Sequence, residues 1–378
     1  MVKSRINTQI LSYFLSWRLA TIVFTFFLIN LVEVKNPLTN SDESLILRLW
    51  NSWDGGHYIG ITLNGYAHLQ QFAFFPFYPI VIKTLTFLGF SPYLASLLIS
   101  NSAFLGALFI LEKLARFYDF NTDQINKTII MIITFPTAFF FLAAYNESLL
   151  LFLSLSALYF AKRKLWFLAS ICVGLASFTK VIGITLVPLL IFELFTQNKL
   201  LLKQSITKGY TFFESLFYLL TFGLSGFYLY AYYLYYRSGN PFLFIKIQSY
   251  WGRTSAINNP ITVLSESVTN FVLPNGTFSL SIQSLEVLII FAAILLFPFV
   301  TKRFGIILGL YTLFLSVFTL LSGKTDSSLR YILTAFPLFL LFGQWATNSK
   351  IFFYTYITTG LMLQALLLTL FLMGHWVG

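Results

Sequence analysis

Long runs of apolar residues recur along the whole chain, and short polar segments separate them. The apolar runs cover about 13–33, 72–90, 92–113, 128–144, 147–162, 165–180, 181–196, 210–235, 285–300, 304–322, 330–347 and 351–373. A helix needs about 20 residues to cross a bilayer, and only a helix or a closed barrel satisfies its backbone polar groups there. The pattern predicts an all-α polytopic membrane protein, with residues 1–378 forming a single domain without internal repeats.

Composition supports this class and excludes others. Charged residues make up 10% of the chain and hydrophobic residues 57%, whereas soluble domains carry about 25% charged residues. The net charge of +11 is spread in short flanks between apolar runs, a distribution typical of topology signals and not of a nucleic-acid surface. The single cysteine, Cys172, excludes an internal disulfide framework. We interpret the first run as a retained span, because it is longer than a signal-peptide core.

The Lys and Arg flanks predict the orientation. Lys3 and Arg5 place the N-terminus in the cytoplasm, so the segment 34–71 lies outside. The later basic flanks are cytoplasmic only if an odd number of crossings separates residue 71 from residue 113, yet two apolar runs lie there. The run 72–90 carries Pro76, Pro79 and Lys83, so we expect it to be juxtamembrane or re-entrant. Eleven spans and an external C-terminus follow, with 14 of the 24 Lys and Arg residues cytoplasmic and eight outside.

This topology gathers the polar side chains of interest on the outer side. They are Asp54, Glu147, Lys180, Trp251, Arg253 and Arg330. Carboxylates and cations together can deprotonate a hydroxyl group and bind a phosphate, which indicates glycosyl transfer or phosphotransfer. Taken singly, such residues also have structural explanations. Asp54 could be a turn or cap residue, its neighbour Trp53 an interfacial anchor, and the nearby His57 a hydrogen-bonded structural residue.

Four sequence blocks resemble a known family. The first reads WDGGHYIGITLNGY followed by FAFFPFYPIV, and the others read TFPTAFFFLAAYNES, GNPFLFIKIQSYWGR and SLRYILTAFPLF. Together they are similar, in the same order, to motifs of the mannosyltransferases related to the second mannosyltransferase of glycosylphosphatidylinositol assembly. That family belongs to the GT-C superfamily of membrane glycosyltransferases. One position departs from it, because Lys180-Val-Ile-Gly183 stands where the family tends to carry Arg, and Lys lacks the bidentate fork.

The resemblance implies a GT-C-like fold and transfer of a sugar, with inversion, from a polyprenyl-phosphate donor to a glycolipid or glycan acceptor on the non-cytoplasmic face. Asp54 would be the general base, assisted by Glu147, while Gly55 and Gly56 leave room for the sugar. Lys180 and Arg330 would hold the donor phosphate, with Arg253 as the weaker candidate. The other expected substrate-binding residues are Trp53, His57, Tyr58, Trp251 and Tyr331.

Several alternatives stay open from the sequence. We do not expect a required cofactor, although Asp54 and Glu147 could complete a weak Mg²⁺ or Mn²⁺ site. A transporter or lipid flippase is the rival from another class, but such proteins usually repeat interrupted helices in two halves. An enzyme of the same superfamily that glycosylates protein from a different lipid-linked sugar, or a non-catalytic subunit, also fits the composition. The expected membrane is the plasma membrane in a prokaryote or the endoplasmic reticulum in a eukaryote.

Overall fold

The computed structural model describes residues 2–32, 42–198, 206–254, 256–271 and 281–378, with the backbone alone at 2–5, 206–209 and 270–271. These residues form α-helices and short 3₁₀ helices and contain no strand, which confirms the predicted all-α class. Lys199 and Lys203, two of the predicted cytoplasmic cations, lie outside the described residues.

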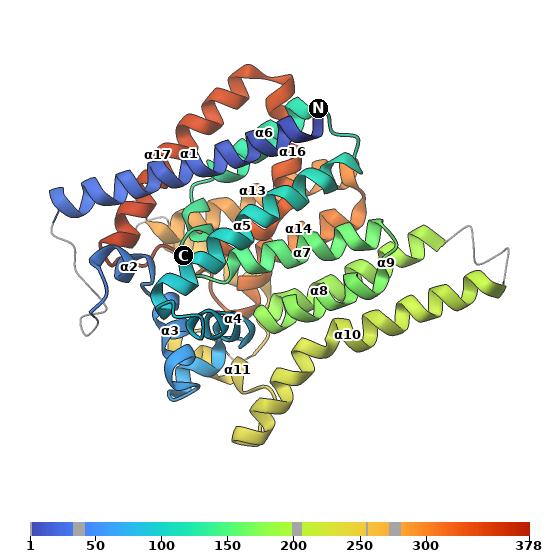
Figure 1. Cartoon of the computed structure of the whole chain (residues 1–378), viewed down its shortest axis with the longest axis horizontal. Helices are drawn as coiled ribbons and strands as arrows, with labels where there is room; N and C mark the ends of the chain where they lie inside the picture. The colour runs from blue at the N-terminus through green and yellow to red at the C-terminus, as the bar shows by residue number, and fades with distance from the viewer. Residues whose placement is uncertain (1, 33–41, 199–205, 255, 272–280) are drawn as a thin grey trace.

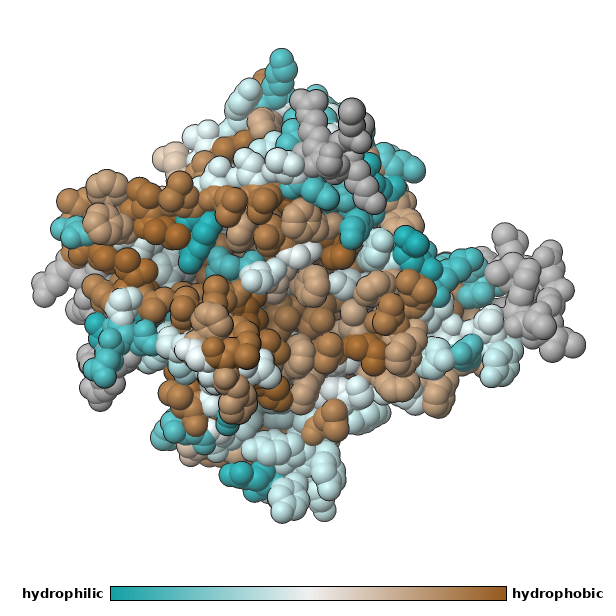
Figure 2. Space-filling view, viewed as in Figure 1, coloured by the Kyte–Doolittle hydropathy of each residue, from teal (hydrophilic) through white to brown (hydrophobic). Residues whose placement is uncertain are grey.

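The long helices run through the molecule, and shorter helices lie between some of them (Figure 1). They are α1 (Val2–Leu31), α5 (Pro92–Arg116), α10 (Ile206–Ser238), α13 (Ile282–Phe304) and α17 (Lys350–Leu372). A sixth continuous helical stretch, Val181–Asn198, joins the 3₁₀ turn η3 (Val181–Thr185) to α9 (Leu186–Asn198). On the face seen in Figure 2, hydrophobic residues form a broad surface, and hydrophilic residues gather toward its edges. These features confirm a polytopic membrane protein.

Fewer helices reach spanning length than the eleven spans that the sequence predicts. Within the described residues, six are long and apolar enough to cross a bilayer, and a bent pair makes up to seven. The bent pair is Ser328–Thr334 and Phe336–Asn348, which meet at 74°. Other predicted spans are shorter helices: α7 (Glu147–Lys162), α8 (Trp166–Thr179) and α14 (Ile306–Val317). The runs 147–162 and 165–180 are themselves short, and α7 and α8 fill them almost completely, whereas α14 ends at Val317, before the run 304–322 does.

The predicted span 128–144 shows this interruption most clearly. Helix α6 (Thr122–Ile133) ends early, and residues 134–146 form a segment that we call the buried connector, which includes the 3₁₀ turn η2 (Ala138–Phe141). Nearly all of its residues are buried. Irregular backbone is tolerated at membrane depth where protein surrounds it. The connector delivers Glu147, the first residue of α7, into the protein interior.

Short helices gather at one end of the bundle, near the C-terminus (Figure 1). They are α2 (Leu45–Trp50), α3 (Asp54–Asn64), α4 (Phe77–Thr86) and α11 (Leu243–Lys246). A further short helix, α12 (Pro260–Phe271), belongs to the predicted loop 236–284. With ten residues, α4 rises about 15 Å, half the hydrocarbon thickness. The helix of the run 72–90 is therefore too short to cross, in agreement with its predicted juxtamembrane or re-entrant position.

The predicted cytoplasmic flanks meet at the other end. Helix α5 starts beside Asn51, whose Nδ2 donates to Tyr93 O at 3.1 Å. Beyond its last turn, Tyr118 O accepts from Arg303 at 2.8 Å, and the Tyr118 ring lies below Lys162 Nζ at 5.4 Å. The basic flanks thus contact one another at the far end of a 25-residue helix, about 37 Å from the short helices.

Candidate active site

A cavity of about 360 Å³ opens among the short helices. Its walls come from α3, the segment after η1 (Leu69–Ala73), the break between α8 and η3, the loop after η4 (Ile247–Trp251) and α15 (Ser328–Tyr331). Of the twelve residues predicted for the site, nine line it, and they are Trp53, Asp54, His57, Tyr58, Lys180, Trp251, Arg253, Arg330 and Tyr331. Segments that are far apart in the sequence therefore meet here, as Asp54 and Arg330 do across 276 positions.

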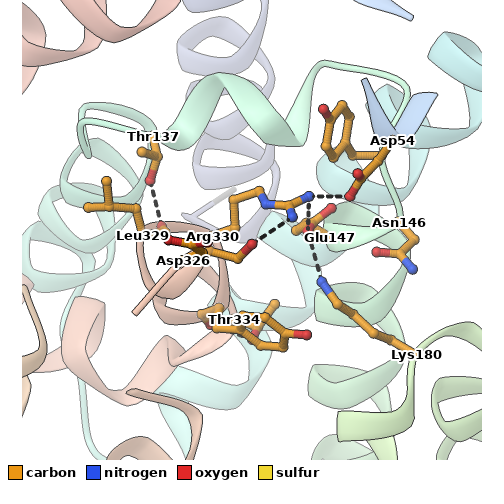
Figure 3. Close-up of polar contacts among 12 residues, drawn as sticks. Asp54, Thr137, Asn146, Glu147, Lys180, Asp326, Leu329, Arg330 and Thr334 are labelled. Carbon is orange, nitrogen blue, oxygen red and sulfur yellow. Dashed lines mark hydrogen bonds and ion pairs between the residues drawn. The ribbon is translucent and has the colours of Figure 1, made fainter. Parts of the chain in front are cut away.

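Arg330 connects the two predicted catalytic carboxylates (Figure 3). Its Nη1 donates to Asp54 Oδ2 at 2.6 Å and lies 3.7 Å from Glu147 Oε1. Lys180 Nζ donates to the same Glu147 oxygen at 2.9 Å. The Glu147 side chain is 1% exposed, Arg330 7%, Lys180 16% and Asp54 20%. Two carboxylates and two cations thus form one network, and Asp54 is its most accessible member.

The buried connector fixes three parts of this network. Ala144 N donates to Trp50 O at 3.0 Å, next to the block that carries Asp54. Thr137 Oγ1 donates to Leu329 O at 2.8 Å, beside Arg330. Asn146 Nδ2 donates to Thr179 O at 2.9 Å, beside Lys180. The break in the predicted span 128–144 is what lets one segment contact all three elements.

Two local backbone features present the charged residues. Trp53 has φ 59 and ψ −119 just before α3 begins at Asp54, a conformation that costs a non-glycine residue about 1–3 kcal/mol and is concentrated at functional sites. Lys180 is extended, with φ −158 and ψ 141, and interrupts the helix between α8 and η3. A Cβ on Gly183 would overlap the backbone of Ala176, so glycine is required for this turn to close against α8.

Asp54 and His57 have opposed environments. Burial disfavours the Asp54 carboxylate, but the charge and hydrogen bond of Arg330 outweigh it and hold the pKa of Asp54 below its ordinary value. Burial lowers the pKa of His57 despite the nearby Asp54 carboxylate. The His57 ring stacks on Phe74 with ring centroids 4.8 Å apart, and it makes an edge contact with Trp251, with centroids 6.2 Å apart. At neutral pH the site therefore holds an ionised Asp54 and a neutral His57.

The three remaining predicted residues lie outside the cavity lining. Glu147 is 1% exposed, and its side chain contacts Lys180 and Arg330. A Cβ built on Gly55 would lie 3.3 Å from Ala144 O, which makes Gly55 a packing position against the connector. Gly56 is half-buried on α3.

The carboxylates do not fit the weak divalent-cation site suggested by the sequence. A metal shared by Asp54 and Glu147 would need the space between them, and the Arg330 guanidinium already lies there. Among the described residues, no group of three or more His, Cys, Asp or Glu side chains could hold a metal ion.

Sequence reasoning missed several residues of the site. Trp376 packs against Trp53 with ring centroids 5.4 Å apart and covers Arg330, whose Cζ lies 4.9 Å from its centroid. Asp326, Ser327 and Gln248 also line the cavity. Trp376 follows the last apolar run and looks like an interfacial anchor, and Ser327 has no local signal beyond its neighbour Arg330.

Comparison with known proteins places the chain. A family described as Mannosyltransferase (PIG-V) matches residues 2–241, which include Asp54, Glu147 and Lys180 but not Arg253 or Arg330. Neither the curated proteins nor the solved structures give a match. The match covers more than half of the chain, and the described helices make it an integral membrane protein. The chain is therefore a membrane glycosyltransferase that belongs to the PIG-V mannosyltransferase family.

Proposed function

We propose that the protein transfers mannose from a polyprenyl-phosphate donor to a hydroxyl group of a glycolipid acceptor, on the non-cytoplasmic face and with inversion. The observation that carries this proposal is the Asp54 carboxylate, which lines a cavity that also holds three cations and a wall of aromatic rings. Aromatic faces suit a sugar or a prenyl chain, and cations suit the phosphate of the donor.

In the proposed reaction the acceptor oxygen attacks the anomeric carbon of mannose. A new carbon–oxygen bond forms as the bond from that carbon to the phosphate oxygen breaks, and the electron pair leaves with the phosphate. The acceptor proton passes to Asp54. Because Arg330 keeps Asp54 ionised, the base is ready at neutral pH. A carboxylate is a weak base, but it can take the proton because the acceptor hydroxyl becomes more acidic as its oxygen bonds to the anomeric carbon.

Activity of Asp54 variants tests the role of this base. Membranes that contain Asp54→Asn or Asp54→Ala should transfer mannose from polyprenyl-phosphate mannose at least about 100-fold more slowly than wild type. Asp123→Asn is the matched control, since Asp123 pairs with Lys127 at 2.8 Å and is 57% exposed on α6. Wild-type turnover by both Asp54 variants would refute the role of Asp54, and a product that keeps the donor's anomeric configuration would refute inversion.

The proposed face rests on the separation of the cavity from the basic flanks. With Cys172 replaced by Ser, a cysteine at Asn64, on the exposed end of α3, should react with a membrane-impermeant maleimide in intact cells. A cysteine at Asp119, at the basic end, should react only after permeabilisation. Both positions are exposed. The reverse labelling pattern would place the cavity on the cytoplasmic side.

A further inference from the structure

Two guanidinium groups converge on one hydroxyl oxygen at the wall of the cavity. Arg253 Nη2 lies 3.1 Å from Ser327 Oγ, and Arg330 Nη2 lies 3.0 Å from the same atom. Arg253 comes from the loop after η4, and Arg330 comes from α15. Arg330 also pairs with Asp54, so the two guanidinium groups here differ: one is paired with a carboxylate and the other, that of Arg253, carries positive charge that an anion would relieve.

The shared oxygen is held in place from below. Ser327 is 1% exposed and has φ 76, a conformation that is uncommon for a residue other than glycine. Its backbone N donates to Oε1 of Glu286 at 2.6 Å, and Glu286 is itself 2% exposed on α13. The buried carboxyl group of Glu286 on α13 thus fixes the turn that presents Ser327 to both arginines.

Arg253 is distinguished from the other cavity cations by its partners. Lys180 pairs with Glu147, and Arg330 pairs with Asp54. The side chain of Asp326, another carboxylate of the cavity wall, pairs with Lys324 at 3.5 Å and not with Arg253. Arg253 donates to neutral oxygens, namely Ser327 Oγ, Asp326 O at 2.9 Å and Gln248 Oε1 at 3.4 Å. No carboxylate of the described residues forms an ion pair with it, so its positive charge is available to a ligand.

We infer that the donor phosphate binds between Arg253 and Arg330, and that Ser327 and Glu286 are positioning residues that hold the two guanidinium groups for it. This inference rests on the proposed function. It reverses the order expected from the sequence, in which Lys180 and Arg330 held the phosphate and Arg253 was the weaker candidate. Lys180 is already neutralised by Glu147 and lies 4.3 Å from the centroid of the Tyr331 ring.

The arrangement also suits the direction of the reaction. The contacts run in series from Asp54 through Arg330 and Ser327 to Arg253. An inverting displacement needs the base and the leaving group on opposite sides of the anomeric carbon. With Asp54 at one end of the series and Arg253 at the other, the sugar would lie between them, and Arg330 would contact both the base and the leaving phosphate.

Binding of farnesyl phosphate to the purified full-length protein in detergent tests the phosphate site without requiring turnover. Arg253→Gln should weaken this binding at least about tenfold, the loss expected for one hydrogen bond between charged groups. Lys180→Gln should change it less than about threefold. Lys324→Gln is the matched control, because it removes a positive charge from an exposed side chain near the same turn. Farnesol, which lacks the phosphate, should bind all four proteins equally.

Variants of the positioning residues test how the site is built. Ser327→Gly removes the shared oxygen and suits the positive φ, so it should weaken farnesyl phosphate binding about three- to tenfold while the thermal midpoint is kept. Glu286→Gln retains an acceptor for Ser327 N and should bind like wild type, whereas Glu286→Ala should not. If Glu286→Ala fails to fold, Ser327→Gly still decides whether the turn positions the arginines.

The outcomes separate this inference from the proposed function. Equal binding of farnesyl phosphate and farnesol by wild type, or a larger effect of Lys180→Gln than of Arg253→Gln, would overturn the inference. Unchanged binding by Ser327→Gly would overturn the positioning role. Arg253-dependent binding in a protein that transfers no mannose would leave the phosphate site standing and refute the proposed reaction.

Discussion

Removing the charge of Glu147 should cost far more stability than removing an exposed carboxylate. Glu147 is 1% exposed, and its Oε1 neutralises Lys180 at 2.9 Å and lies 3.7 Å from Arg330. Glu147→Gln keeps the volume but leaves two largely buried cations with Asp54 as their only carboxylate. Breaking a buried pair costs about 3–5 kcal/mol, and because Lys180 keeps some contact with the cavity we expect about 3 kcal/mol.

A double-mutant cycle isolates the pair. Lys180→Met should cost a similar amount, since it leaves Glu147 buried with only the longer Arg330 contact. The double variant should recover about 2 kcal/mol relative to the sum, because neither uncompensated charge remains and the pair of Asp54 with Arg330 is intact. The free energy of unfolding in mixed micelles is the measurement. Glu193→Gln is the control: its pair with Lys162 at 3.0 Å is more exposed, so about 1 kcal/mol or less is expected. Additive effects, or equal costs for Glu147→Gln and Glu193→Gln, would refute the reasoning.

Two further predictions follow from local features. Arg330→Gln should move the acid limb of the pH–rate profile to higher pH, because the pKa of Asp54 is depressed by Arg330 against the effect of burial. In wild type, the stability from ionised Asp54 is present above its unfolded pKa and is lost only as pH falls through the depressed folded pKa; an unshifted acid limb would mean that Asp54 does not control the rate. Gly183→Ala should lower the thermal midpoint and the activity, since its Cβ would overlap the Ala176 backbone. Gly223→Ala, whose Cβ would meet only ordinary contacts at 3.5 Å or more, should be neutral or stabilising in its helix, and equal midpoints for the two variants would contradict the packing argument.

A helix that ends inside a predicted span explains why the sequence predicts the site only in part. Hydropathy is a local property, so it finds the apolar run 128–144, but it does not report that α6 ends at Ile133. The end of that helix depends on contacts with distant elements, such as Thr137 with Leu329 and Asn146 with Thr179. The same contacts place Glu147 below Lys180 and Arg330 and not in the cavity.

The sequence by itself determined the all-α membrane class, the family, and most residues of the site, because apolar length, basic flanks and motif letters are carried by short segments. Only the tertiary structure decided which cation pairs with which carboxylate. It placed Arg330 between Asp54 and Glu147, left Arg253 without a carboxylate, and brought Ser327, Glu286 and Trp376 to the site. The physical reason is that ion pairing depends on distances of a few ångströms between residues that are as many as 276 positions apart in the chain.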